Sequence, residues 1–210
     1  GNFEDVAFDY RVDDVIQNGR GTALSDIYYR GRLDILSGNW LGYHRAYVLE
    51  NNEFKDIGSK DFDEPSRIRT IISADFDNDG FDEIFMNNIA EPNKLFRIKD
   101  NGKFEQIDFQ VGLEANGYGT GAAVADIDND GFDEVFMNNI AEPNRLFRIK
   151  DNGKFEQIDF KVGLESNGYG TGAAVADIDD DGILELLVSR GESKAQTLTL
   201  YKAKVDKGNK

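Results

Sequence analysis

The chain has 210 residues, with 40 acidic and 24 basic side chains, no cysteine and a net charge of −16. This length suits a single domain, 1–210, with a core of its own. The acidic balance argues against nucleic acid as a partner. The lack of cysteine excludes disulfides, thiolate zinc sites and cysteine nucleophiles. No apolar run is long enough to cross a membrane, so we expect no membrane insertion.

Short strand-forming segments recur along the chain at a fixed period. An acidic loop begins at Asp75, at Asp126 and at Asp177, with 51 residues from each start to the next. Repeats of this length built from short strands predict propeller blades, because one blade cannot bury both of its faces alone. We therefore expect an all-β, four-bladed β-propeller of four-stranded antiparallel blades, at about 17–62, 67–109, 117–160, and 168–205 together with 1–8.

The N-terminal segment has the pattern of a strand that the last repeat lacks. Phe104–Ile107 and Phe155–Ile158 are read as the fourth strands of their repeats, whereas the last repeat stops after Thr197–Lys202. Phe3–Val6 shows the same Phe-x-x-aliphatic spacing. We expect this N-terminal strand to complete the last blade, closing a ring with no open edge between the chain ends.

The first repeat carries an altered acidic loop. Asp26–Asp34 aligns without a gap with Asp126–Glu134, but its positions 3 and 5 are Tyr28 and Arg30. Losing two carboxylates and gaining a guanidinium should abolish metal binding, and Arg30 could bridge the acids at positions 1 and 9. We expect a salt bridge in this loop and no ion.

An aromatic cluster replaces Ile140–Asn144 of the third repeat in the loop after the second strand. Its members Trp40, Tyr43 and His44 could contact a sugar or anchor a protein partner. Alternatively, Trp40 only fills the space that Ile140 fills in its own repeat.

Two arginines also interrupt the repeat. Arg20 and Arg69 stand where later copies have Thr120 and Thr171. On innermost strands they could line a central channel and attract an anion, or they could pair with neighbouring acids. The sequence leaves both interpretations open.

The three intact acidic loops are the main candidate sites. Acidic residues at positions 1, 3, 5 and 9 and a glycine at position 6 direct hard oxygen ligands at one point, which suits Ca²⁺ better than Mg²⁺. An EF-hand begins in the same way, but here position 12 is Met or Val instead of Glu, and strand formers follow the glycine. We expect three strand-joining Ca²⁺ sites with the carboxylate ligands Asp75, Asp77, Asp79, Glu83, Asp126, Asp128, Asp130, Glu134, Asp177, Asp179, Asp181 and Glu185.

Two plainer interpretations of these loops fit the sequence less well. A solvated, turn-forming cluster would explain one loop, but three copies with intact spacing favour metal binding. Paired carboxylates can also serve catalysis, but their recurrence in every repeat indicates a structural device instead of one active site. We expect no catalytic residue and no enzyme activity.

The D-x-D-x-D-G loops, with the Gly-x-Gly-x-x-Val-Ala-Asp run before them, resemble the FG-GAP/VCBS repeats of integrin α-subunit propellers and of the cartilage acidic protein family. The resemblance covers essentially the whole chain. It implies a calcium-binding β-propeller, exported or on the cell surface, and a backbone-carbonyl ligand at position 7 from Phe81, Phe132 and Ile183. Position 9 is Glu where that family usually has Asp, and four repeats are fewer than the seven blades common there.

These observations predict an extracellular recognition or adhesion scaffold, secreted or on the cell surface, with three structural Ca²⁺ ions. A carbohydrate-binding, lectin-like module of a secreted protein is the alternative, and an incomplete propeller that closes only by oligomerising is a third. We expect a protein or glycan partner and a monomeric chain. No signal peptide is present at the Gly1–Asn2 start, which suggests a processed chain.

Overall fold

The computed structural model describes residues 1–99, 101–107, 112–113, 116–150, 152–158, 164, 170–191 and 195–204. Fifteen strands and no helix occur in these ranges, so the all-β prediction is confirmed for them. The ends predicted for the second, third and fourth blades, at 109, 160, 168 and 205, lie outside the described residues. No helix in the described part of the chain is long and apolar enough to cross a membrane.

The strands fall into four groups in chain order. Group 1 consists of β1 (Gly19–Ser25), β2 (Asp34–Asn39), β3 (Arg45–Glu50) and β4 (Glu53–Asp56). Group 2 consists of β5 (Ile68–Ala74), β6 (Glu83–Pro92), β7 (Lys94–Ile98) and β8 (Phe104–Gln106). Group 3 consists of β9 (Asn116–Ala125), β10 (Glu134–Asn139), β11 (Arg145–Ile149) and β12 (Phe155–Gln157). Group 4 consists of β13 (Gly170–Ala176), β14 (Glu185–Arg190) and β15 (Thr199–Lys202).

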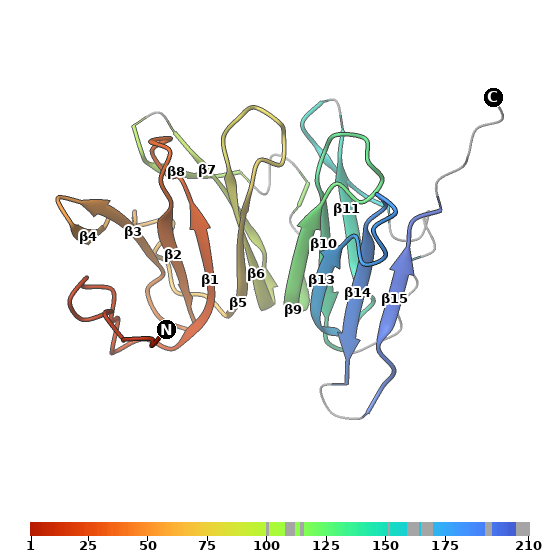
Figure 1. Cartoon of the computed structure of the whole chain (residues 1–210), viewed down its shortest axis with the longest axis horizontal. Coiled ribbons are helices and arrows are strands. Elements are labelled where there is room, and N and C mark those ends of the chain that lie inside the picture. The colour runs from red at the N-terminus through yellow and green to blue at the C-terminus, as the bar shows by residue number, and fades with distance from the viewer. Residues whose placement is uncertain are drawn as a thin grey trace.

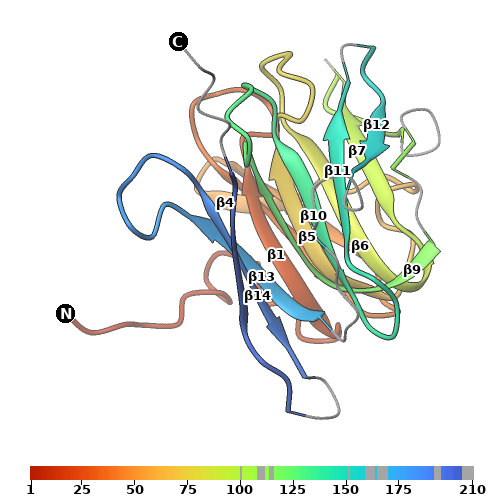
Figure 2. The ribbon, with the colours of Figure 1, turned by 90° about the vertical axis from the view of Figure 1, so that its right-hand side faces the viewer.

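Within each group, every strand pairs antiparallel with the next strand in the chain. Groups 2 and 3 are also joined edge to edge, because the far end of β6 pairs with the start of β9 through Ile89 and Tyr118. The innermost strands follow one another, with β5 between β1 and β9, and β9 against β13. The groups therefore form a row with group 1 and group 4 at its ends (Figure 1). Figure 2 looks along this row, with group 4 facing the viewer.

The core lies between successive groups, because alternate residues of a strand point to opposite faces of its sheet. Leu36 and Val48 of group 1 are fully buried against Ile84 and Phe96 of group 2. The opposite face of group 2 packs in the same way on group 3, and the far face of group 3 packs on group 4. Each inner group is thus apolar on both faces, as the repeat interpretation requires.

Among the described residues, no strand group packs on the outer faces of the two end groups. Ile178 of group 4 is 56% exposed, whereas the corresponding Phe76 of group 2 is 1% exposed. Leu200 of β15 and Leu24 of β1 are 55% and 56% exposed. Apolar side chains at both ends of the row therefore remain in contact with solvent.

The prediction that residues 1–8 complete the last blade is wrong. Residues 1–18 form no strand, Phe3 is fully exposed, and the described part of group 4 has three strands. The segment lies instead beside group 1, where the Phe54 N–H donates to the Tyr10 carbonyl (3.4 Å) and the two rings meet at 6.3 Å. Asp14 holds it there by accepting from Asn39 Nδ2 (2.8 Å) of β2. These contacts place the N-terminal segment beside group 1, at the end of the row opposite to group 4.

Candidate metal centres

The acidic loops join the first two strands of groups 2, 3 and 4, and their backbone is folded by their own side chains. In each loop the Asp at position 1 accepts hydrogen bonds from the N–H groups at positions 5 and 6, at 2.8–3.1 Å. Position 6 has a positive φ of 82° to 95°, which favours glycine. Position 4 has φ near 60° and is Asn78, Asn129 or Asp180, the residue types that tolerate this region best.

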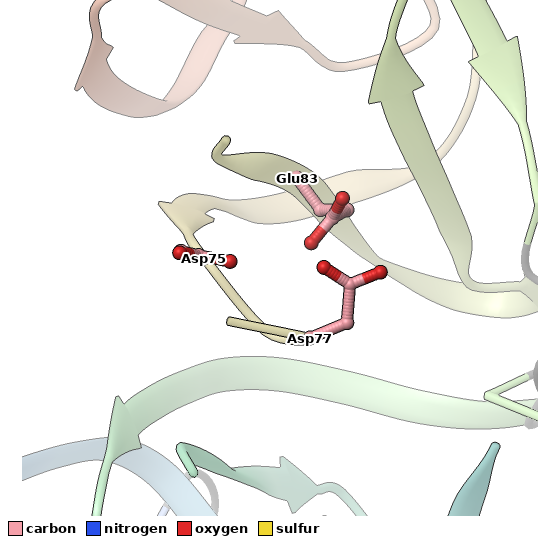
Figure 3. Close-up of side chains that lie close together, drawn as sticks. All are labelled: Asp75, Asp77 and Glu83. Atoms are coloured by element: carbon pink, nitrogen blue, oxygen red, sulfur yellow. The ribbon is translucent and has the colours of Figure 1, made fainter. Parts of the chain in front are cut away.

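Three carboxylates of each loop converge. Asp75, Asp77 and Glu83 place one oxygen each within 4.8 Å of one another, and their side chains point toward a common space (Figure 3). The same arrangement recurs in the other two loops with Asp126, Asp128 and Glu134, and with Asp177, Asp179 and Glu185. The structure thus brings together positions 1, 3 and 9 in all three predicted sites.

The position-9 glutamate is the buried member of each cluster, although it begins the second strand. Glu83 and Glu134 are each 1% exposed and Glu185 is 3% exposed. In each loop this glutamate also accepts the N–H of position 2 through Oε2, at 2.8–3.2 Å. Burial, together with the charge of Asp77, raises the pKa of Glu83 to about 7. Burial likewise raises the pKa of Glu134 to about 7. Each buried glutamate thus lies beside two more exposed carboxylates, a grouping that a bound cation would stabilise.

A basic side chain from the third strand contacts each cluster, and the loop motif alone did not predict it. Arg97 Nε lies 3.2 Å from Glu83 Oε1, and the same guanidinium contacts Asp77. Arg148 repeats these contacts on Glu134 and Asp128, and Lys202 Nζ lies 2.7–2.8 Å from three acids of the last loop. Arg97 and Lys202 are the ladder partners of the position-9 glutamates, so strand register was the signal that could have found them.

The remaining predicted ligands occupy the rim of the loops. The position-5 carboxylate accepts the N–H of position 7 in every loop, Asp79 from Phe81 (2.9 Å), Asp130 from Phe132 (3.0 Å) and Asp181 from Ile183 (3.0 Å). A hydrogen bond thus joins positions 5 and 7 of each loop, and the position-5 carboxylate is not among the three that converge. Their roles as ligands remain a prediction.

In the first intact loop, the carboxylate at position 8 contacts the neighbouring group instead of the converging cluster. Asp82 accepts hydrogen bonds from Ser73 Oγ (2.9 Å) of its own group and from Ser25 Oγ (3.1 Å) of group 1. The carboxylate therefore links two neighbouring groups at the loop end.

The altered loop of group 1 contains the expected ion pair. Arg30 Nη2 lies 3.0 Å and 3.1 Å from the two carboxylate oxygens of the buried Asp34. Asp26 accepts the Arg30 backbone N–H (2.8 Å) instead of its guanidinium. The salt bridge to position 9 is confirmed, and the predicted bridge to position 1 is replaced by a backbone hydrogen bond.

The predicted ligand-contact cluster is divided by the fold. His44 is fully buried, where its Nδ1 accepts the Asn39 N–H (3.0 Å). In group 3 the side chain of Asn144 accepts the equivalent N–H of Asn139 (3.0 Å). His44 therefore has a structural role and cannot contact a ligand at the surface. Tyr43 is 57% exposed.

A comparison with protein families agrees with this geometry. The family model described as FG-GAP-like repeat matches residues 26–86, 75–137 and 126–188. Each match begins at position 1 of one acidic loop and ends at position 12 of the next. The matches together span more than half of the sequence, so the chain belongs to the FG-GAP-like repeat family, as the motifs indicated.

The relatives found are cartilage acidic proteins. The chain is 37% identical over 212 residues to cartilage acidic protein 1 of Xenopus tropicalis, which covers 97% of the chain and 26% of that relative. It is 42% identical over 163 residues to the Homo sapiens protein of the same name, covering 70% and 25%. The Mus musculus protein is 41% identical over the same length. The chain spans about a quarter of the length of these relatives.

Proposed function

We propose that the four strand groups are blades of a calcium-binding β-propeller that acts as an extracellular recognition or adhesion scaffold without enzyme activity. The observation that carries this proposal is the threefold recurrence of one carboxylate triad at the same point of successive repeats. A device repeated at each loop stabilises the rim of a scaffold, whereas a catalytic site needs to occur only once.

The donor set fits Ca²⁺. Every converging ligand is a carboxylate oxygen, the hard donor that Ca²⁺ prefers, and no nitrogen or sulfur donor belongs to any of the three clusters. The side chains at positions 1, 3, 5 and 9 and the carbonyl at position 7 would hold the ion. Its positive charge would offset the mutual repulsion of the buried glutamate and its neighbours.

Calorimetric titration with CaCl₂ tests the sites one by one. We expect three ions per chain, and one fewer in each of Asp77→Asn, Asp128→Asn and Asp179→Asn. Asp61→Asn removes the same charge from an exposed position outside the loops and should leave the stoichiometry unchanged. A wild-type protein that binds no calcium, or loop variants that all retain three ions, would refute the assignment.

Calcium should also stabilise the fold, because it binds the folded loops in preference to the unfolded chain. For sites of about 0.1 mM affinity, millimolar calcium adds about 1–2 kcal/mol per site. The melting temperature should therefore fall when EGTA is added and recover with excess CaCl₂. An identical melting curve in both conditions, with calcium removal verified by elemental analysis, would contradict this expectation.

Family membership and the cartilage acidic protein relatives support an extracellular role. We propose a protein as the partner. Calcium-dependent capture of a defined surface protein would support this role. Glycan binding that disappears in Trp40→Ala would favour the lectin-like alternative instead. We also propose a monomer, although the exposed Leu24 and Leu200 leave apolar surface at both ends of the row that could favour association. Light scattering tests this directly, and a dimer or larger assembly would contradict the proposal.

A further inference from the structure

Arg20 and Arg69 occupy a special backbone position. The pairing of each innermost strand with its neighbour shifts register at one residue, which is therefore the extra residue of a β-bulge. That residue is Arg20 in group 1, Arg69 in group 2, Thr120 in group 3 and Thr171 in group 4. Bulges change the direction of a side chain and often occur beside functional sites.

The two threonines are satisfied within the fold, whereas the two arginines are not. Thr120 Oγ1 donates to the carbonyl of Gly170, and Thr171 Oγ1 lies 3.0 Å from Ser189 Oγ. Within the described ranges, Arg20 and Arg69 are the arginines whose guanidinium groups make neither an ion pair nor a hydrogen bond. Arg69 Nε is even buried without a hydrogen-bond acceptor. This is unexpected in a chain with 40 acidic side chains.

Both guanidinium groups lie against one aromatic ring. The Cζ atoms of Arg20 and Arg69 are 5.7 Å and 5.1 Å from the ring centroid of Trp40. Cation–π contacts stabilise each arginine, but they also bring two like charges together. Because threonine fills the same bulge in groups 3 and 4, the fold itself does not require an arginine there.

We propose that Arg20, Arg69 and Trp40 form a binding site for an oxyanion, either a carboxylate or a sulfate group. A planar guanidinium offers paired N–H donors that match such groups, and an oxyanion would offset the repulsion between the two arginines. The site lies near the starts of β1 and β5, at the opposite end of the strands from the acidic loops. It does not depend on the calcium proposal.

The single tryptophan provides a direct readout, since Trp40 is the only one in the chain. Its fluorescence is recorded while sodium sulfate or sodium malonate is added, with sodium chloride at matched ionic strength as the reference. We expect a saturable change with at least one of the two oxyanions, and the one that acts identifies the preferred group. A response that chloride reproduces, or no response to either oxyanion, would overturn the proposal.

The double variant Arg20→Thr/Arg69→Thr copies the residues of the later repeats and should weaken binding about tenfold or more. The neighbouring Arg67, which is exposed and 3.7 Å from Glu91, provides the control Arg67→Thr, which should bind as the wild type does. Should the double variant fail to fold by circular dichroism, Arg20→Thr alone supplies the comparison. Equal oxyanion affinity in wild type and variant would overturn the proposal.

Discussion

His44 should make the folded protein sensitive to mild acid. Its Nε2 lies 3.0 Å from Ser66 Oγ, and Ser66 donates its own proton to Asn88 Oδ1 (2.8 Å), so Nε2 must carry the imidazole hydrogen. Nδ1 accepts the Asn39 N–H and cannot be protonated without losing that bond. Burial, assisted by the charge of Lys94, lowers the pKa of His44 to about 4.

The direction and size of the stability change with pH follow from this pKa. The unfolded chain binds a proton at His44 near pH 6.5, whereas the folded chain does so only near pH 4. The stabilisation from the neutral imidazole is therefore complete above pH 6.5 and is lost as the pH falls toward 4. The shift corresponds to about 3 kcal/mol, a large part of the 5–15 kcal/mol that is typical of a domain.

The variant His44→Asn isolates this contribution. Asparagine occupies the same place in groups 2 and 3, where Asn93 and Asn144 accept the equivalent N–H at 2.8 Å and 3.0 Å. Urea unfolding of both proteins across this pH range cancels the titrations that they share. We expect the wild type to lose about 3 kcal/mol relative to the variant as the pH falls. A stability difference that does not change with pH would refute the role assigned to the imidazole.

Three further predictions concern the loops and the inner strands. Arg97→Met should tighten calcium binding to its loop several-fold by removing a partly exposed competitor for the same carboxylates; unchanged calorimetric affinity would contradict this. Gly21→Ala should lower the free energy of unfolding by about 1–3 kcal/mol, because its Cβ would lie 2.9 Å from the backbone of β5. Gly19→Ala is the control, since its Cβ would meet nothing closer than 3.8 Å. Equal melting temperatures for the two variants would contradict close packing between β1 and β5. Tyr28→Asp with Arg30→Asp should create a fourth calcium site, and a stoichiometry that stays at three would exclude this.

The repeat pattern predicted most of the fold because two features constrain each strand. Apolar and polar residues alternate within the strand, and the strand recurs after 51 residues. Phe85 and Phe136, 51 residues apart, are both buried between groups. The spacing of the acidic loops likewise predicted the converging carboxylates, since ligand, turn glycine and following strand lie within nine residues. Local order of this kind can be read from one sequence.

Contacts between distant segments could not be read in this way. The Phe3–Val6 pattern fitted the missing strand of the last repeat, but the contacts of Tyr10 and Asp14 with group 1 decide where that segment lies. Arg97 reaches its loop only because β7 pairs with β6 in one register. Periodicity contains neither piece of information, because both depend on which surfaces meet in three dimensions.

The matching faces of groups 2 and 3 have a consequence for how such a chain can change in length. Phe85 and Phe136 occupy corresponding places, yet Phe85 packs with Val135 of the next group and Phe136 packs with Leu186. The same kind of face therefore packs on group 3 in one case and on group 4 in the other. A gene duplication that inserted another unit of 51 residues between groups 2 and 3 would find a complementary face on each side. Loss or gain of a whole unit thus requires no new interface, whereas insertion of half a unit would break two.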